Sequence, residues 1–293
     1  MSNTKKSVDN PLKGYFRQYD SWVTLPSKEM GIYPPEVAEV NEDGEIGVMP
    51  MTGSDEILLK NPDALYNGEA IRQVIKSCCP SVKNPDKLLL NDLEALIVAI
   101  RKASYGKVMD MEVTCPECKK KSTLGLDLED ALQYVEYLGK EYSVVITHGS
   151  GANKVDLRIH ICPYRYESYL KIQKKTFEEE KIIRALQSRN VDEGEKITHI
   201  SNAYQKIAQL SFNTVAESVL RITSEDDGDL DVDDADHIFE FMMNISRENA
   251  KKISNALDSI AELGVKKKFD MTCEHCEHEF EERVIYDPAS FFS

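Results

Sequence analysis

The sequence lacks the features that mark a membrane or an exported protein. None of its 293 residues belongs to an apolar run of 18 or more, the length that a membrane-spanning helix needs. Residues 1–11 are polar and contain no apolar core of the kind found in a secretory signal. We therefore expect no membrane span and a protein that is made and folded in a cytoplasm.

Catalytic motifs are also missing. There is no Gly-x-Ser-x-Gly, no Walker loop, no His-Glu-x-x-His and no dinucleotide fingerprint. The 6 histidines are scattered, and a lone histidine of this kind is usually a surface residue. Gly149-Ser150-Gly151 could cradle a phosphate, but no helix start and no Gly-Lys-Ser/Thr follow it, so we favour a hairpin turn. These absences predict a protein that is not an enzyme.

Basic residues are in the minority. Lys and Arg number 36 against 51 Asp and Glu, which gives a net charge of −15. Such a charge repels nucleic-acid phosphates and anionic membranes, so we expect no nucleic-acid partner. Alternating aspartates in residues 224–234 could bind calcium, but Val232 and Ile238 occupy the EF-hand positions for glycine and glutamate. A solvated loop that ends in a helix N-cap is the favoured interpretation.

The 7 cysteines, an odd number, argue against a secreted disulfide framework. Four of them form two short motifs with 154 residues between them, Cys115-Pro116-Glu117-Cys118 and Cys273-Glu274-His275-Cys276. Both motifs follow a similar lead-in that contains Asp-Met and ends in Thr. The first motif lies between two expected strands, whereas a thioredoxin-like redox motif starts a helix. This context favours metal binding.

Two such motifs, called knuckles below, supply four thiolates, and zinc prefers a tetrahedral set of this kind. We therefore predict one structural zinc ion and two knuckles that meet in space. Ordinary ribbons separate their cysteine pairs by about 15 to 20 residues, so residues 119–272 would leave one ribbon and return to it. A closed site of four thiolates also argues against catalysis. The predicted ligands are Cys115, Cys118, Cys273 and Cys276, with His160, Cys162, His275 and His278 as possible substitutes.

Hydrophobic periodicity predicts an α+β protein that is mostly helical, with a split zinc-ribbon-like β element and a β-hairpin. The expected segments are an extended arm (1–52), a helical hairpin (53–107), the first knuckle with a β-hairpin (108–163), a helical insertion (164–265), and the second knuckle with a C-terminal strand (266–293). Within them we expect helices near 55–79, 84–106, 126–138, 164–188, 196–222, 232–244 and 246–263, and hairpin strands near 142–147 and 155–161.

The arm is rich in turn formers and aromatics and carries the only tryptophan, Trp22. Two interpretations remain open: the arm lies along a partner, or it packs on its own core. Cys78 and Cys79, at the end of an expected helix, are interpreted as buried thiols rather than ligands.

Several segments resemble the T4-type bacteriophage baseplate hub proteins, a family of hub subunits and hub assembly proteins. The likeness is best over residues 20–120 and 268–292. The segments that carry it are Leu25-Pro26-Ser27 ahead of Tyr33, the run Pro50-Met51-Thr52-Gly53-Ser54-Asp55-Glu56-Ile57-Leu58-Leu59, Asp63-Ala64-Leu65-Tyr66-Asn67-Gly68, Asp92, Ile100-Arg101-Lys102-Ala103-Ser104-Tyr105-Gly106, the Cys-Pro-x-Cys knuckle, and Asp287-Pro288-x-Ser290-Phe291-Phe292.

This resemblance implies a structural component or assembly factor of the baseplate hub of a contractile tail. Its partners would be other hub and tail proteins, and its locations the host cytoplasm during assembly and then the virion baseplate. We expect the arm and Phe291-Phe292 to contact partners, because exposed aromatics are typical interface anchors. Two alternatives remain: a zinc-ribbon adaptor that binds a host factor, which predicts a basic face, and a zinc hydrolase, which needs an open ligand position.

Overall fold

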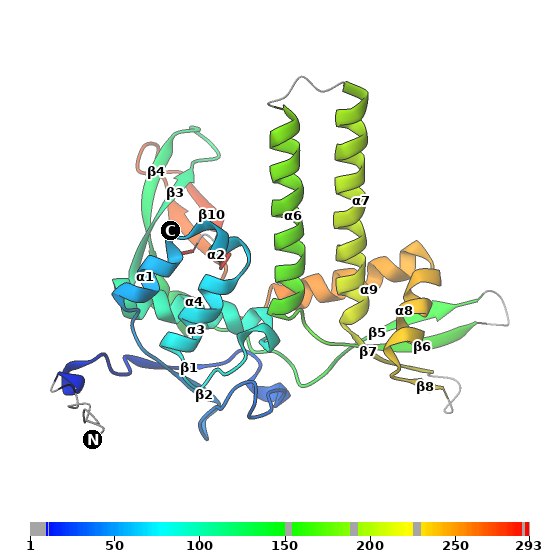
Figure 1. Ribbon diagram of the computed structural model, residues 1–293, viewed down its shortest axis with the longest axis horizontal. Helices are drawn as coiled ribbons and strands as arrows, with labels where there is room; N and C mark the ends of the chain where they lie inside the picture. The colour runs from blue at the N-terminus through cyan, green and yellow to red at the C-terminus, as the bar shows by residue number, and fades with distance from the viewer. Residues whose placement is uncertain are drawn as a thin grey trace, which may run out of the picture.

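The computed structural model describes residue 10 and residues 12–149, 154–187, 193–224, 230–288 and 291–292. The chain is α+β, as predicted, and forms two hydrophobic cores with a long helical hairpin rising between them (Figure 1). Among the helices of these residues, none combines the length and the apolar composition that crossing a bilayer requires.

Helices α1 (Gly53–Leu59), α2 (Pro62–Tyr66) and α3 (Glu69–Cys78) replace the single helix expected over 55–79. The Asn61 side chain, just before Pro62, caps α2 by accepting from the N–H groups of Asp63 and Ala64. Gly68 then adopts a φ of 77° and ends that helix. The expected helix is therefore broken at two points where the backbone cannot continue it.

Helix α4 (Leu90–Tyr105) is the centre of the first core. The predicted apolar stripe is correct, since Leu93, Leu96, Ile97 and Ile100 are all fully buried. The start signal at 84–85 instead opens a short 3-10 turn, so the helix begins six residues after Asn84.

The N-terminal segment forms a small antiparallel sheet of β1 (Ser21–Thr24) and β2 (Glu45–Val48). One face of this sheet, made by Val23, Ile46 and Val48, is buried in the first core beside α4. The opposite face carries Trp22, which is 52% exposed. The arm thus packs on its own core with one face and leaves the other uncovered.

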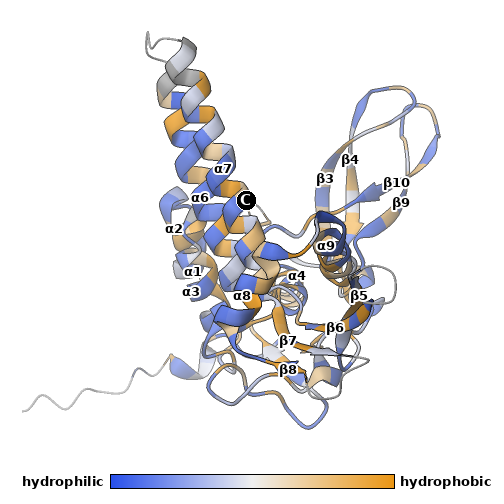
Figure 2. Cartoon of the chain, turned by 90° about the vertical axis from the view of Figure 1, so that its right-hand side faces the viewer, coloured by the Kyte–Doolittle hydropathy of each residue, from blue (hydrophilic) through white to orange (hydrophobic). Residues whose placement is uncertain are grey.

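Two antiparallel ribbons carry the knuckles. The first pairs β3 (Val108–Thr114) with β4 (Lys121–Asp127), and the second pairs β9 (Lys268–Thr272) with β10 (Glu279–Arg283). Figure 2 shows the two ribbons beside each other, although they are far apart in the sequence. Helix α5 (Leu128–Gln133) follows β4 and is shorter than the helix expected over 126–138, whose first two residues belong to the strand.

The second core is built on a four-stranded sheet in the order β5-β6-β7-β8. The hairpin of β5 (Tyr142–His148) and β6 (Val155–Ile161) was predicted, and most of its glycine-rich turn lies outside the described residues. Helices α8 (Ala235–Asn244) and α9 (Arg247–Ala261) pack on this sheet. Asp234 caps α8, as expected, while residues 225–229 of the acidic run lie outside the described residues.

The helix expected over 196–222 is wrong at its C-terminal end, and the helical insertion expected over 164–265 contains strands. Strands β7 (Val219–Ser224) and β8 (Asp231–Val232) interrupt this segment, and β7 pairs with β6. Val219 and Ile222 are buried in the second core, where they extend the sheet rather than α7. The pairing is long-range, so the local pattern around residue 220 did not reveal it.

Helices α6 (Tyr166–Gln187) and α7 (Glu193–Glu217) form the projecting hairpin (Figure 1). Glu179 of α6 is only 4% exposed and pairs with Lys175 of the same helix at 2.9 Å. Its second ion pair, with Lys206 of α7 at 3.2 Å, joins the two helices. At the hairpin base, Leu170 packs on Gly68.

Candidate metal centre

The four cysteines of the two knuckles meet at the tips of the two ribbons. Their sulfur atoms all lie within 4.8 Å of one another. The closest contacts join one knuckle to the other, with 3.7 Å between the Sγ atoms of Cys115 and Cys276 and 3.7 Å between those of Cys118 and Cys273. Within the described residues, no other cluster of His, Cys, Asp or Glu has a geometry that could hold a metal ion.

The two tips have the same backbone geometry. In the first, the N–H of Cys115 donates to Lys120 and the N–H of Lys119 donates to Cys115. The second repeats both bonds, from Cys273 to His278 and from Glu277 to Cys273. Lys119 and Glu277 share a φ of 59°, the left-handed conformation that glycine adopts more easily. The similar lead-ins seen in the sequence therefore reflect two copies of one turn.

The sulfur positions fit a tetrahedral metal ion. A zinc–sulfur bond of about 2.3 Å in a tetrahedron places neighbouring sulfur atoms about 3.8 Å apart. The contacts of 3.7 Å match that spacing, and all four cysteines are free thiols. Cys115 and Cys273 are buried, Cys118 is half-buried and Cys276 is exposed. Four soft donors at this spacing could hold a thiophilic cation.

Electrostatics favour the thiolate form of one ligand. The backbone N–H of His275 donates to the Sγ of Cys273 over 3.4 Å. This bond is the largest cause that lowers the pKa of Cys273 to about 6, and the N–H of Cys276 and the neighbouring thiols add to it. The pKa of Cys276 in the same knuckle is instead raised to about 12, although the N–H of His278 opposes the effect of burial and of the neighbouring thiols. A thiolate is the form that binds a metal, so Cys273 is the more ready of the two to coordinate one.

The other thiols and imidazoles considered from the sequence lie outside the four-sulfur cluster. His275 is next to it, but its ring nitrogen Nε2 lies 3.3 Å from the carbonyl oxygen of Lys121. Cys162 belongs to the second core, and Cys78 and Cys79 are buried at the end of α3, as expected. The residues that do not join the cluster are His160, Cys162, His275 and His278.

A buried network connects the N-terminal loop to α4 and gives a structural role to three residues of the resemblance. Asp92 is fully buried and accepts from the N–H of Ser27 at 2.9 Å and from its hydroxyl at 2.5 Å. The Tyr33 hydroxyl also donates to Asp92 and accepts from the N–H of Leu89 at 2.7 Å. Burial raises the pKa of Asp92 to about 6. The network stabilises the fold and does not form a site open to substrate.

The C-terminal phenylalanines do not form the exposed anchor that the sequence suggested. Phe291 is only 6% exposed and packs edge-on against Tyr286 at 5.4 Å. The Arg101 guanidinium lies 5.4 Å from the same ring and donates to the Phe291 carbonyl. Phe292 is half-buried against Phe291. The exposure that this prediction assumed is therefore wrong for Phe291, whose ring packs between Tyr286 and Arg101 of α4.

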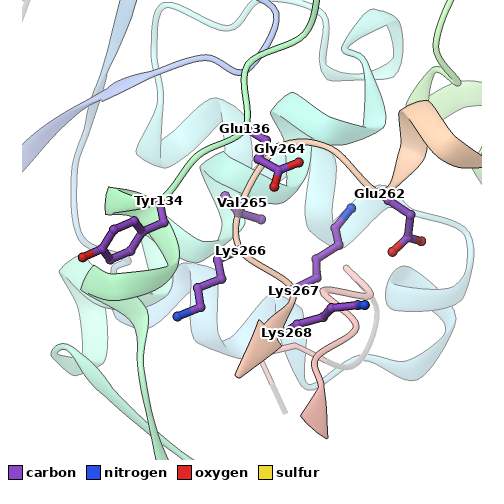
Figure 3. Close-up of a pocket in the computed structure, with 8 residues that line it drawn as sticks. All are labelled: Tyr134, Glu136, Glu262, Gly264, Val265, Lys266, Lys267 and Lys268. Carbon is purple, nitrogen blue, oxygen red and sulfur yellow. The ribbon is translucent and has the colours of Figure 1, made fainter. Parts of the chain in front are cut away.

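A pocket of about 550 Å³ lies where the chain passes from α9 to β9 (Figure 3). Three consecutive lysines line it, but their side chains diverge (Figure 3). Lys266 pairs with Asp130 at 2.7 Å and Lys267 with Glu94 at 2.7 Å. Because the lysines diverge and these two are paired with carboxylates, the pocket does not gather positive charge at one point.

Comparison with known proteins identifies one family. A model of the family described as T4 bacteriophage base plate protein matches residues 33–293. This range includes both knuckles, the helical hairpin and all of the two cores except Val23, Leu25 and their neighbours before residue 33. Comparison with curated proteins and with solved structures gives no match.

Proposed function

Since the chain belongs to the T4 bacteriophage base plate protein family, we propose that it serves the central hub of a contractile-tail baseplate through protein–protein contacts. Membership supports a structural role in a phage baseplate, with other tail proteins as partners. The proposal has two forms. In the first, the protein is a hub component that stays in the virion; in the second, it is an assembly factor that works in the host cytoplasm and then leaves.

The observation that carries this proposal is the family match over residues 33–293, nearly the whole chain. The hub assignment also draws on the segments that resemble hub proteins. In the first core these segments contact one another: the N–H of Met51 donates to Ser104 at 2.9 Å, and Arg101 contacts Phe291. These contacts stabilise the fold, as expected of a protein that acts by assembling with other proteins.

We further propose that Cys115, Cys118, Cys273 and Cys276 hold one structural zinc ion. Four thiolates would complete the tetrahedron and leave no ligand position for water or substrate. The ion would join two ribbons that bury little core of their own and so add to the free energy of folding. A closed centre of this kind supports the proposal that the protein is not an enzyme.

Quantitative mass spectrometry of purified virions and of baseplate precursors tests the function, with the tail-tube subunit as internal standard. A retained hub component is expected at a fixed ratio in both samples. An assembly factor is expected in precursors and depleted in virions. Absence from both samples would refute a role in the hub.

A further inference from the structure

The outer face of the β1–β2 sheet presents two uncovered aromatic side chains. Tyr19 and Trp22 are 48% and 52% exposed, and their rings stack with centroids 5.4 Å apart. Just before them in the chain, Tyr15 and Phe16 are 87% and 57% exposed. Tyr19 and Trp22 are called the aromatic face below. They lie outside residues 33–293, so the family match assigns them no role.

The aromatic face is held in place by the backbone beneath it. Gly47 lies opposite Trp22 in the sheet, and a Cβ atom there would be 2.7 Å from the Tyr19 ring. Only glycine lets the ring lie this close to the strand. Arg17 turns inward and donates to the carbonyl oxygens of Pro50 and Ser77. The rings therefore point outward from a fixed strand, and docking a partner on them costs little ordering of the chain.

Acidic residues are frequent in and around the β1–β2 hairpin that carries the aromatic face. Residues 36–45, which lead into β2, contain five acidic residues and no basic one. Glu42 and Asp43 are exposed in the turn that precedes β2, and Asp20 is exposed beside Tyr19. Glu45 lies opposite Thr24, on the same side of the sheet as Trp22. The surface thus combines stacked rings with negative charge.

We propose that the aromatic face binds an arginine-bearing segment of another baseplate protein, in which arginine alternates with apolar residues. A guanidinium stacks on tryptophan and tyrosine rings and pairs with carboxylates through a planar fork, which the compact ammonium of lysine cannot do. A second copy of this chain would bring another net charge of −15, and an anionic bilayer is repelled in the same way. The inference rests on the proposed function, because it names the chemistry of a tail partner.

The chain contains 1 tryptophan, so the emission of Trp22 reports directly on this surface. Full-length protein is titrated with three peptides of equal length that alternate leucine with arginine, lysine or glutamate. The arginine peptide is expected to shift the emission saturably and to bind about threefold or more tighter than the lysine peptide. Added salt should weaken binding, and the glutamate peptide should give no response.

Two variants and two matched controls test whether the arginine peptide binds at the aromatic face. Tyr19→Ser removes the stacking partner of Trp22, and Glu42→Gln with Asp43→Asn removes charge from the turn that precedes β2; each should weaken the arginine peptide about fivefold or more. Tyr204→Ser, at a tyrosine 69% exposed on α7, and Glu240→Gln, at an exposed residue of α8, should leave binding unchanged. Thermal melts followed by circular dichroism check that every variant is folded.

Some outcomes would overturn the inference. They are an equal response to the glutamate peptide, no response to any peptide, an equal loss in the controls, or a shift with anionic vesicles alone, which would indicate a membrane surface. Incorporation of Tyr19→Ser into baseplates separates the two proposals. If wild type and variant enter particles equally, the hub role stands without this contact. If the peptide binds as expected but the chain is in no particle or precursor, the surface chemistry stands and the hub role fails.

Discussion

At the residue scale, Lys119 and Glu277 occupy a left-handed backbone conformation at the tips of the knuckles. Residues with a Cβ atom lose about 1 to 2 kcal/mol there, and glycine loses about 0.5 to 1 kcal/mol in added chain entropy. Lys119→Gly and Glu277→Gly should therefore each stabilise the protein by about 0.5 to 1 kcal/mol in urea unfolding. Lys120→Gly, at a neighbour without positive φ, is the matched control and should destabilise it. Destabilisation by both knuckle variants would contradict the assigned backbone geometry.

The buried carboxyl of Asp92 predicts a dependence of stability on pH. Its pKa is raised to about 6 by burial, against about 3.9 in an unfolded chain. The folded state therefore binds this proton first, so the stabilising contribution is complete below about pH 4 and is lost as the pH rises to about 6. The difference in unfolding free energy between wild type and Asp92→Asn should fall by about 2 to 3 kcal/mol over that window.

Urea unfolding between pH 4 and pH 7 measures this difference. Asp110→Asn, at an exposed position of β3, is the control. Tyr33→Phe is a milder probe of the same network, since it removes one donor to Asp92 and the acceptor of the Leu89 N–H. Its cost should be about 1 to 3 kcal/mol. A flat difference for Asp92→Asn would show that the carboxyl is not desolvated.

Residue chemistry alone predicted the cluster of four cysteines better than it predicted the exposed anchors. Cysteine in paired C-x-x-C motifs has few roles in a reducing compartment, so the meeting of Cys115 and Cys276 followed from type and spacing. Phenylalanine can serve a core or an interface equally well. Whether Phe291 is buried depends on Arg101, 190 positions earlier in the chain, and no local pattern contains that contact.

At the element scale, the hairpin base depends on one glycine. Gly68 has a φ of 77°, and a Cβ atom there would lie 2.4 Å from a methyl carbon of Leu170. Leu170 is 8% exposed in α6 and has little space to move. Gly68→Ala should destabilise the protein by about 2 to 3 kcal/mol through backbone strain and overpacking.

Thermal unfolding of four variants, Gly68→Ala, Leu170→Ala, their combination and Gly53→Ala, separates these two causes. Gly53→Ala, at a glycine with no heavy atom within 4 Å of the added Cβ, should change the unfolding free energy by less than about 0.5 kcal/mol. Leu170→Ala combined with Gly68→Ala relieves the overpacking but keeps the strain, so the two changes should cost less than their sum. Strict additivity would argue that α6 does not rest on this turn.

Elements set by local signals were predicted, and those set by distant pairing were not. The apolar stripe of α4 and the Asp234 cap of α8 each depend on residues that lie within one or two helical turns of one another in the sequence. Strand β7 was interpreted as the end of a helix because the whole α6–α7 hairpin separates it in the sequence from its partner strand β6. The helix expected over 55–79 ran through Gly68, because its φ of 77° depends on contacts that the local sequence does not contain.

At the scale of the whole molecule, the four-cysteine cluster joins two knuckles that are separated by 154 residues in the sequence. Cys115→Ser and Cys273→Ser should each abolish the binding of one zinc ion per chain, since both supply the same tetrahedron. Elemental analysis of the purified variants measures this, with Cys162→Ala as a cysteine control that keeps its zinc. Zinc at 100 times its Kd should add about 2.7 kcal/mol to wild-type stability and nothing to either serine variant. Independent loss, or no loss, would refute a shared site.

The number of residues between the knuckles also determines when, during translation, the four cysteines can come together. A ribosome adds about 5 to 20 residues per second, so the 154 residues between the cysteine pairs take about 8 to 30 s to make. During that interval the first pair of thiols is outside the ribosome without the second pair. The tetrahedron of the proposed zinc site can close only after Cys276, the last of the four cysteines, has been made. A metal-loaded centre would therefore mark a chain translated past residue 276, which a copy truncated before that residue cannot carry.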